Sequence, residues 1–218
     1  MIFASCGGGS EKPTADIVAH IPWSATESLE YVLKEGSRQT ATGTLSVSVQ
    51  GSETRLVQRY TSGANRDEIT VVVASESLKP LSSTRVITGT NDDATIEVTY
   101  TPEGAVIRQG EKQSGVSVPE HSYDNDASLF VWRTIDFREA YTANYTTIIT
   151  NRRSRQTIEI KVAGKERVTV PAGTFDAWRL EIKGANANQV AWYADTPARI
   201  LLKYDNDRGT IWELVALP

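Results

Sequence analysis

The chain has 218 residues, a formal net charge of −4 and a single cysteine, Cys6. An acidic chain lacks the positive surface that neutralises phosphates, so we expect no nucleic-acid partner. One cysteine excludes an intramolecular disulfide and the usual cysteine zinc clusters. A chain of this length buries a sizeable core without either of them, and we expect a single β domain over residues 14–218.

Residues 1–13 resemble a targeting signal followed by a tether. Ala4-Ser5-Cys6 has the small residues before a cysteine that are typical of the bacterial lipobox, which makes Cys6 the predicted lipidation site. Gly7-Gly8-Gly9-Ser10 follows as a flexible linker. A signal peptide needs an apolar stretch of roughly 7–15 residues, so we expect the true start of the reading frame upstream. The prediction is an extracytoplasmic, membrane-anchored lipoprotein on the periplasmic or cell-surface side, with a cytosolic chain as the alternative.

Strand patterns dominate the rest of the chain. Apolar and polar residues alternate with a period of two, as in Leu45-Ser46-Val47-Ser48-Val49, which is typical of half-buried strands. Turn sequences such as Gly164-Lys165 and Asn206-Asp207-Arg208-Gly209 separate the segments. We expect about 10–12 strands in one strongly curved antiparallel sheet, a half-barrel or barrel. The strand segments are 29–33, 45–49, 55–60, 69–73, 86–87, 96–100, 105–107, 147–149, 158–162, 168–170, 178–182, 190–192, 200–202 and 212–214.

Two stretches break this alternation. Residues 14–28 have no clear period and are interpreted as a short helix or as a cover over one end of the sheet. Between residues 129 and 137, apolar residues recur at a spacing nearer to that of a helix. With Asp126 as its N-cap, this segment predicts a short amphipathic helix. One or two short helices therefore cover or plug the curved sheet.

The segment 162–181 carries a resemblance to a known family. Its hairpin motif Val170-Pro171-Ala172-Gly173-Thr174-Phe175 resembles that of an uncharacterised bacterial lipoprotein family, a domain of unknown function. The resemblance is firm over residues 155–216. It implies a fold similar to that of the lipoprotein-localisation carriers and receptors, in which a curved sheet wraps a helix and shelters acyl chains. It implies no catalytic residues.

Few residues in the sequence indicate a catalytic or metal-binding site. His121 lies beside Ser122 and Asp124, but neighbours on one loop seldom form a working triad, so we expect no enzyme. The repeated Asp-Asn-Asp segments at 124–126 and 205–207 admit a calcium interpretation, which turn formation explains more simply. We expect no metal and no cofactor.

Aromatic and basic residues give the remaining hypotheses. Tryptophans line either lipid pockets or sugar platforms, although Trp178, Trp192 and Trp212 share the phase of aliphatic neighbours and favour core packing. A concentration of positive charge at Arg152, Arg153 and Arg155, with Lys161, Lys165 and Arg167 nearby, is a candidate contact for anionic lipid headgroups.

The predicted function is a tethered carrier for a lipid or acylated protein, with a largely apolar cavity. The alternative is a structural or interaction lipoprotein of the envelope with a filled core. The candidate ligand-binding residues are Phe130, Trp132, Trp178, Trp192 and Trp212, and the candidate anionic-surface contacts are Arg152, Arg153 and Arg155.

Overall fold

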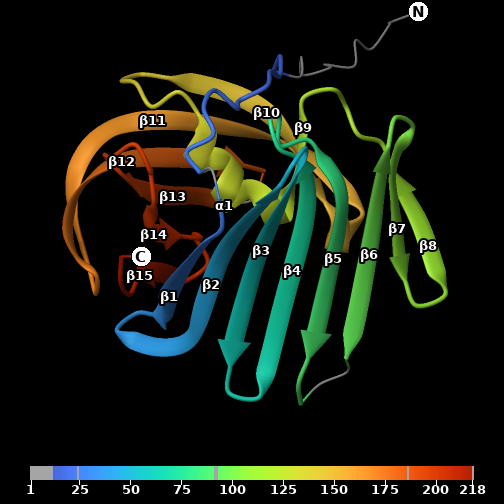
Figure 1. Ribbon diagram of the computed structural model, residues 1–218, viewed down its shortest axis with the longest axis horizontal. Coiled ribbons are helices and arrows are strands. Elements are labelled where there is room, and N and C mark those ends of the chain that lie inside the picture. Colours follow the sequence, from blue (N-terminus) through green and yellow to red (C-terminus); the bar gives the residue numbers. More distant parts are fainter. Residues whose placement is uncertain (1–11, 24, 91–92, 186, 218) are drawn as a thin grey trace, which may run out of the picture.

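A computed structural model describes residues 12–23, 25–90, 93–185 and 187–217. Their strands form one 15-stranded sheet in the order β8-β7-β6-β5-β4-β3-β2-β1-β15-β14-β13-β12-β11-β10-β9. Neighbouring strands are antiparallel except for the last pair, β9 and β10, which run parallel. The sheet curls around a short helical segment without closing into a barrel, as Figure 1 shows. The predicted mainly β class with a strongly curved sheet is confirmed.

The first wall of the sheet is a meander of eight strands joined by short turns. Each strand pairs with its sequence neighbour, and β1 also pairs with β15, so the first and the last strand lie side by side in the middle of the sheet. The strands of this wall are β1 (Glu27–Glu35), β2 (Arg38–Gln50), β3 (Glu53–Ser62), β4 (Asn65–Ala74), β5 (Pro80–Thr88), β6 (Ala94–Thr101), β7 (Gly104–Gln109) and β8 (Lys112–Val116).

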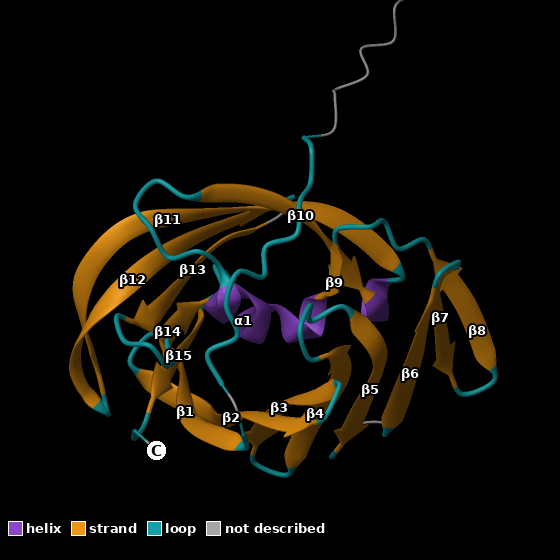
Figure 2. Ribbon diagram, turned by 45° about the horizontal axis from the view of Figure 1, so that its top comes forward, coloured by secondary structure: helices purple, strands orange, loops and turns teal. Residues whose placement is uncertain are grey.

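The second wall follows the helical segment and returns to β1. Two of its strands, β11 and β12, are long and bend over the helices (Figure 2). The elements of this half are β9 (Ser122–Asp124), η1 (Asn125–Ala127), α1 (Ser128–Val131), η2 (Trp132–Thr134), β10 (Thr142–Ile149), η3 (Thr150–Arg152), β11 (Ser154–Val170), β12 (Gly173–Gly184), β13 (Ala187–Ala194), β14 (Leu201–Asp205) and β15 (Thr210–Leu214).

The expected strand count is too low for two physical reasons. The strands β8 and β9 were missed because the first is polar and the second has three residues, so neither shows a clear alternation.

The predicted turn at Gly164-Lys165 is wrong. Gly164 lies inside the 17-residue strand β11, where a register shift after Val162 and a φ of +130° mark a bulge that bends the strand.

The helical segment lies inside the curve of the sheet, as the sequence predicts (Figure 2). All four residues of α1 are buried. The predicted N-cap, Asp126, is wrong by two positions, because the carboxylate of Asp124 accepts the backbone N–H of Asp126 at 2.8 Å and begins η1. Asp124 is extended and Asp126 already lies inside the first turn, which is why the earlier aspartate takes the capping role.

Residues 14–23 form the predicted cover and contain no helix. The backbone N–H of Ala15 donates to Asn144, and those of Ala19 and His20 both donate to the carbonyl of Thr134. Ile17, at 1% exposure, inserts into the main core. The N-terminal segment therefore seals the end of the sheet at which the helical segment terminates.

Side chains join the edge strand β9 to the opposite wall. The hydroxyl of Tyr100 in β6 donates to Asp124 at 2.6 Å, and Ser83 in β5 also hydrogen-bonds to this carboxyl. A carboxylate thus ties the two walls where the backbone ladder does not continue. In the described part of the chain, no helix has the length and apolar character needed to cross a bilayer.

Candidate functional site: a polar cleft inside the curved sheet

The inward-facing side chains change from apolar to polar along the strands. In β3, Leu56 is buried in the core, whereas Gln58 and Tyr60 occupy the next two inward positions. The same change separates Ile69 from Asp67 in β4. At one end of the sheet the inward positions are filled by Tyr60, Asp67, Arg85, Gln156, Gln189 and Tyr204.

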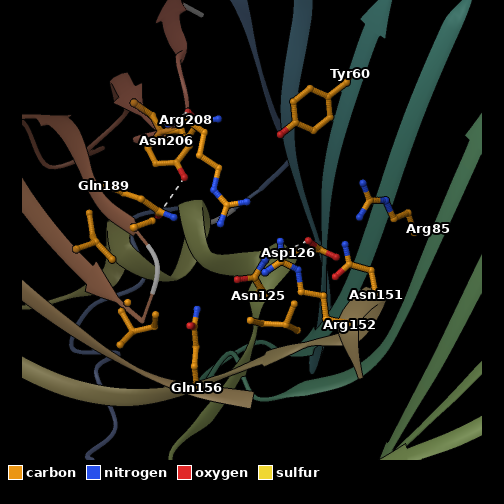
Figure 3. Close-up of a pocket in the computed structure, with 16 residues that line it drawn as sticks. Tyr60, Arg85, Asn125, Asp126, Asn151, Arg152, Gln156, Gln189, Asn206 and Arg208 are labelled. Carbon is orange, nitrogen blue, oxygen red and sulfur yellow. Dashed lines mark hydrogen bonds between the residues drawn. The ribbon is translucent and has the colours of Figure 1, made fainter. Parts of the chain in front are cut away.

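These polar ends enclose a cleft of about 330 Å³ over the start of the helical segment (Figure 3). Its floor is formed by Asn125 and Asp126 of η1. Its rim is formed by turns: η3 contributes Asn151 and Arg152, and the β14–β15 turn contributes Asn206 and Arg208. Pockets of about 300–1,000 Å³ are typical of small-molecule sites, so this cleft has the size to hold a ligand.

A narrower recess of about 150 Å³ continues from the cleft toward the core. Trp132 and Tyr145 line it, and the indole Nε1 of Trp132 donates to the Tyr145 hydroxyl at 2.7 Å. Gln58 donates to the Tyr60 hydroxyl at 2.9 Å. Burial raises the pKa of Tyr60 to about 12 and that of Tyr145 to about 12, so both phenols stay neutral hydrogen-bonding groups.

The charged groups of the cleft differ in how far they are already paired. Arg85 is held by two hydrogen bonds to Asp67, Nε to Oδ1 at 2.9 Å and Nη2 to Oδ2 at 2.5 Å. Arg152 and Arg208 are exposed at the rim, and among the described residues neither has an acidic partner within 4.0 Å. Two guanidinium groups therefore remain available to a ligand.

The carboxyls at the floor of the cleft are in an unfavourable environment for negative charge. Burial, followed by the nearby charge of Asp126, raises the pKa of Asp124. Burial is also the largest cause of the raised pKa of Asp126, which the positive charge of Arg85 partly offsets. Asp124 is committed to the Tyr100 hydroxyl and to its capping bond, whereas Asp126 faces the cleft.

The structure brings one of the five predicted aromatic residues to the cleft. Trp132 lines the inner recess, and Phe130 is buried in the core. Trp212 is also buried, as its predicted core packing requires, and it lies edge-on to Tyr31 and Tyr60. A ligand-binding role for any of the five stays a prediction.

The other two tryptophans lie at the sheet surface. Trp178 is half-buried, and its indole N–H donates a hydrogen bond to Asp195 at 2.8 Å. Trp192 is partly buried and packs only against the margin of the core, because Ala191 and Tyr193 take the buried phase of β13 and Trp192 faces Lys203 and Glu166.

The predicted basic patch is divided by the fold. Only Arg152 lines the cleft, whereas Arg153 sits in a left-handed turn and Arg155 donates to Ser117 at 2.6 Å. Lys165 pairs with Asp195 on another part of β11. Contact with an anionic membrane stays a prediction. The predicted lipidation site, Cys6, lies outside the described residues.

The remaining polar candidates have structural partners. His121 Nδ1 lies 3.3 Å from Asp16, whose carboxylate also pairs with Lys79. The second Asp-Asn-Asp segment makes the hydrogen bonds of a turn, from Asp207 N–H to Asp205 and from Arg208 N–H to Asn206. Over the described ranges, no three His, Cys, Asp or Glu side chains gather to hold a metal ion.

Most of the cleft residues were not predicted from the sequence. The alternation predicted the strand that contains Gln58 and Tyr60, without assigning a role to a polar residue in an inward position. That was the available signal: Gln58, Gln156 and Gln189 each share the phase of buried apolar neighbours. The predicted apolar cavity is wrong for this cleft, because its inward positions are occupied mainly by amides, tyrosines and charged groups.

Comparisons with known proteins agree with this architecture. A beta-barrel-like protein of the domain of unknown function DUF1849 from Brucella abortus is similar over 91% of this chain and 98% of its own, with a TM-score of 0.54 and 10% identity. This likeness shows the fold alone. A protein with a YmcC-like fold from Bacteroides fragilis aligns over 93% of this chain and 99% of its own at 10% identity, but its TM-score of 0.32 supports no argument.

The family is established by sequence. No match was found among the curated proteins. The model of a family described as a protein of unknown function, DUF3108, matches residues 30–211, a wider range than the segment that carries the hairpin motif. The chain therefore belongs to the DUF3108 family.

Proposed function

We propose that this protein is an extracytoplasmic binding module whose cleft takes a small polar ligand with negative charge. The observation that carries the proposal is the pair Arg152 and Arg208, two exposed guanidinium groups that face one polar cleft. Arginine presents a planar set of donors that matches phosphate and carboxylate oxygens, and two of them on one cleft favour an anion.

The walls of the cleft suit the uncharged part of such a ligand. Gln156, Gln189 and Asn206 offer both donors and acceptors, and the Tyr204 hydroxyl already donates to Gln189 at 3.0 Å. The recess beside Trp132 adds aromatic surface. A ligand with hydroxyl groups and a compact ring or chain would use both parts.

The sequence predicts a different ligand, a lipid or acylated protein in an apolar cavity. An acyl chain in this cleft would leave amide and guanidinium groups without hydrogen-bonding partners, which is unfavourable. We therefore assign the cleft to a polar group. Attachment to a membrane through Cys6 and a location outside the cytoplasm stay part of the proposal, with the lipobox as their support.

The alternative, an envelope protein that acts only through its outer surface, requires a filled interior. The core between the walls is filled, as the buried Trp212 and Tyr193 show, but the cleft at the polar end is open. The open cleft favours binding over the purely structural role. The proposal involves no chemical step on the ligand.

Isothermal titration calorimetry with matched small molecules tests the proposal. The probes are glucose 6-phosphate, citrate, glucose and palmitate. We expect the two anions to bind the chain more tightly than glucose does, and the Arg152→Gln/Arg208→Gln variant to lose at least tenfold in anion affinity, about 1.4 kcal/mol. The matched control is Arg153→Gln/Arg167→Gln, which removes the same net charge away from the cleft and should stay within about twofold of the parent affinity.

Three results would overturn the proposal: no binding of either anion, equal losses in the two double variants, or tight binding of palmitate that displaces the anions. The first would leave the surface-acting alternative. The second would mean that only the net charge matters. The third would restore the apolar carrier that the sequence predicts.

A further inference from the structure

The cleft has positive charge at its rim and a negative charge at its floor. Arg152 and Arg208 belong to turns on the open side, whereas Asp126 belongs to η1, which forms the base between the two walls (Figure 3). A ligand that spans the cleft therefore meets groups of opposite charge at its two ends.

No cation in the described part of the chain neutralises Asp126 directly. Arg85, whose positive charge acts on Asp126, has its Nε and Nη2 occupied by Asp67, and both of these side chains are 22% exposed. The side-chain partner of the Asp126 carboxylate is the amide of Asn125 at 3.5 Å, the outer limit for a hydrogen bond. A half-buried carboxylate is thus left open toward the cleft.

An unpaired carboxylate in such a place is costly unless a ligand supplies the missing charge. Burial disfavours its ionised form, and a cation placed next to it would reverse this effect. A divalent metal needs several oxygen ligands, and the described residues gather no such group here. An ammonium group needs only one carboxylate and a few acceptors, which Asp126 and the side-chain oxygen of Asn125 provide.

We infer that the cleft selects ligands that carry both an ammonium group, received by Asp126, and an anionic group, received by Arg152 and Arg208. This inference rests on the proposed function and narrows its ligand to a zwitterion. Phosphoethanolamine has this chemistry, both as a free molecule and as the headgroup of a phospholipid. Ethyl phosphate lacks only the ammonium group and serves as its matched partner.

The test is calorimetric titration of the chain with phosphoethanolamine and with ethyl phosphate. We expect phosphoethanolamine to bind at least tenfold more tightly. In the Asp126→Asn variant this preference should fall to about twofold or less, while ethyl phosphate binds as well as before or better. The control is Asp207→Asn, since Asp207 holds the corresponding position of the second Asp-Asn-Asp segment but does not line the cleft, and it should keep the full preference.

Each other result has a definite meaning. Equal binding of the two probes, or an unchanged preference in Asp126→Asn, overturns the zwitterion inference and leaves the proposed anion site in place. Binding of neither probe, together with failure of the anions above, overturns both. Dihexanoyl phosphatidylethanolamine separates the sources of the headgroup, because tighter binding than that of free phosphoethanolamine assigns it to a lipid and weaker binding to a soluble molecule.

Discussion

Two segments of this protein share the sequence Tyr-Asp-Asn-Asp and have different roles. In both, the first aspartate accepts the backbone N–H two residues later, from Asp126 to Asp124 at 2.8 Å and from Asp207 to Asp205 at 2.9 Å. The first segment is inside the sheet, where Asp124 is 1% exposed and tied to Tyr100. The second is a turn at the surface. Local sequence sets the hydrogen bond, and the surrounding fold decides whether that bond supports the core or only a turn.

Removal of the first aspartate of each segment should separate the two roles most strongly. We expect Asp124→Ala to lower the free energy of unfolding by about 2–4 kcal/mol, because it removes a helix cap and leaves buried partners unsatisfied. Asp205→Ala should cost about 0.5–1 kcal/mol, the value of one turn. Urea unfolding of the two variants measures both values. Equal losses would show that burial of the first segment adds nothing to its hydrogen bond.

The pH dependence of stability provides the next test. The pKa of Asp124 in the folded chain is raised to about 7, above its usual value of 3.8, so the folded state binds the proton more tightly than the unfolded state. Its contribution is therefore full below pH 4 and is lost as the pH rises through about 7. Between pH 5 and pH 8 we expect the parent chain to lose about 1–3 kcal/mol more than Asp124→Asn, or about 2–4 °C in Tm for each kcal/mol. Parallel melting curves for the two proteins would contradict this assignment.

The hydroxyl of Tyr100 gives the smallest of the three effects. Tyr100→Phe removes the donor to a buried carboxyl and should cost about 1–2 kcal/mol, more at pH 8 than at pH 5. The matched change is Tyr204→Phe, which removes a donor to the neutral Gln189 and should cost about 0.5–1 kcal/mol at both pH values. Thermal unfolding at the two pH values distinguishes them. A pH-independent loss in Tyr100→Phe would mean that Asp124 does not titrate in this range.

The sequence predicted the fold well because the alternation of β strands is a local signal. Residues such as Leu45, Val47 and Val49 identify a strand without knowledge of its partners. The bulge at Gly164 could not be predicted in this way, because a glycine between two alternating runs is compatible with either a turn or a bend. The tie between Tyr100 and Asp124 depends on how far the sheet curls, which no local pattern contains.

The site was less predictable than the fold. Gln58, Arg85 and Gln189 are far apart in the chain and meet only because their strands end at the same side of the sheet. Five aromatic residues were predicted as ligand contacts because such side chains line lipid pockets and sugar platforms, yet only Trp132 reaches the recess of the cleft. A polar residue in the inward phase of a strand was the more informative sign, and Gln58, Gln156 and Gln189 occupy such positions.

A crystal structure of the chain with phosphoethanolamine tests the account most directly. We expect the phosphate between Arg152 and Arg208 and the ammonium group beside Asp126. The recess beside Trp132 should hold no part of the ligand. A ligand bound elsewhere, or an acyl chain in the cleft with the arginines turned away, would contradict it.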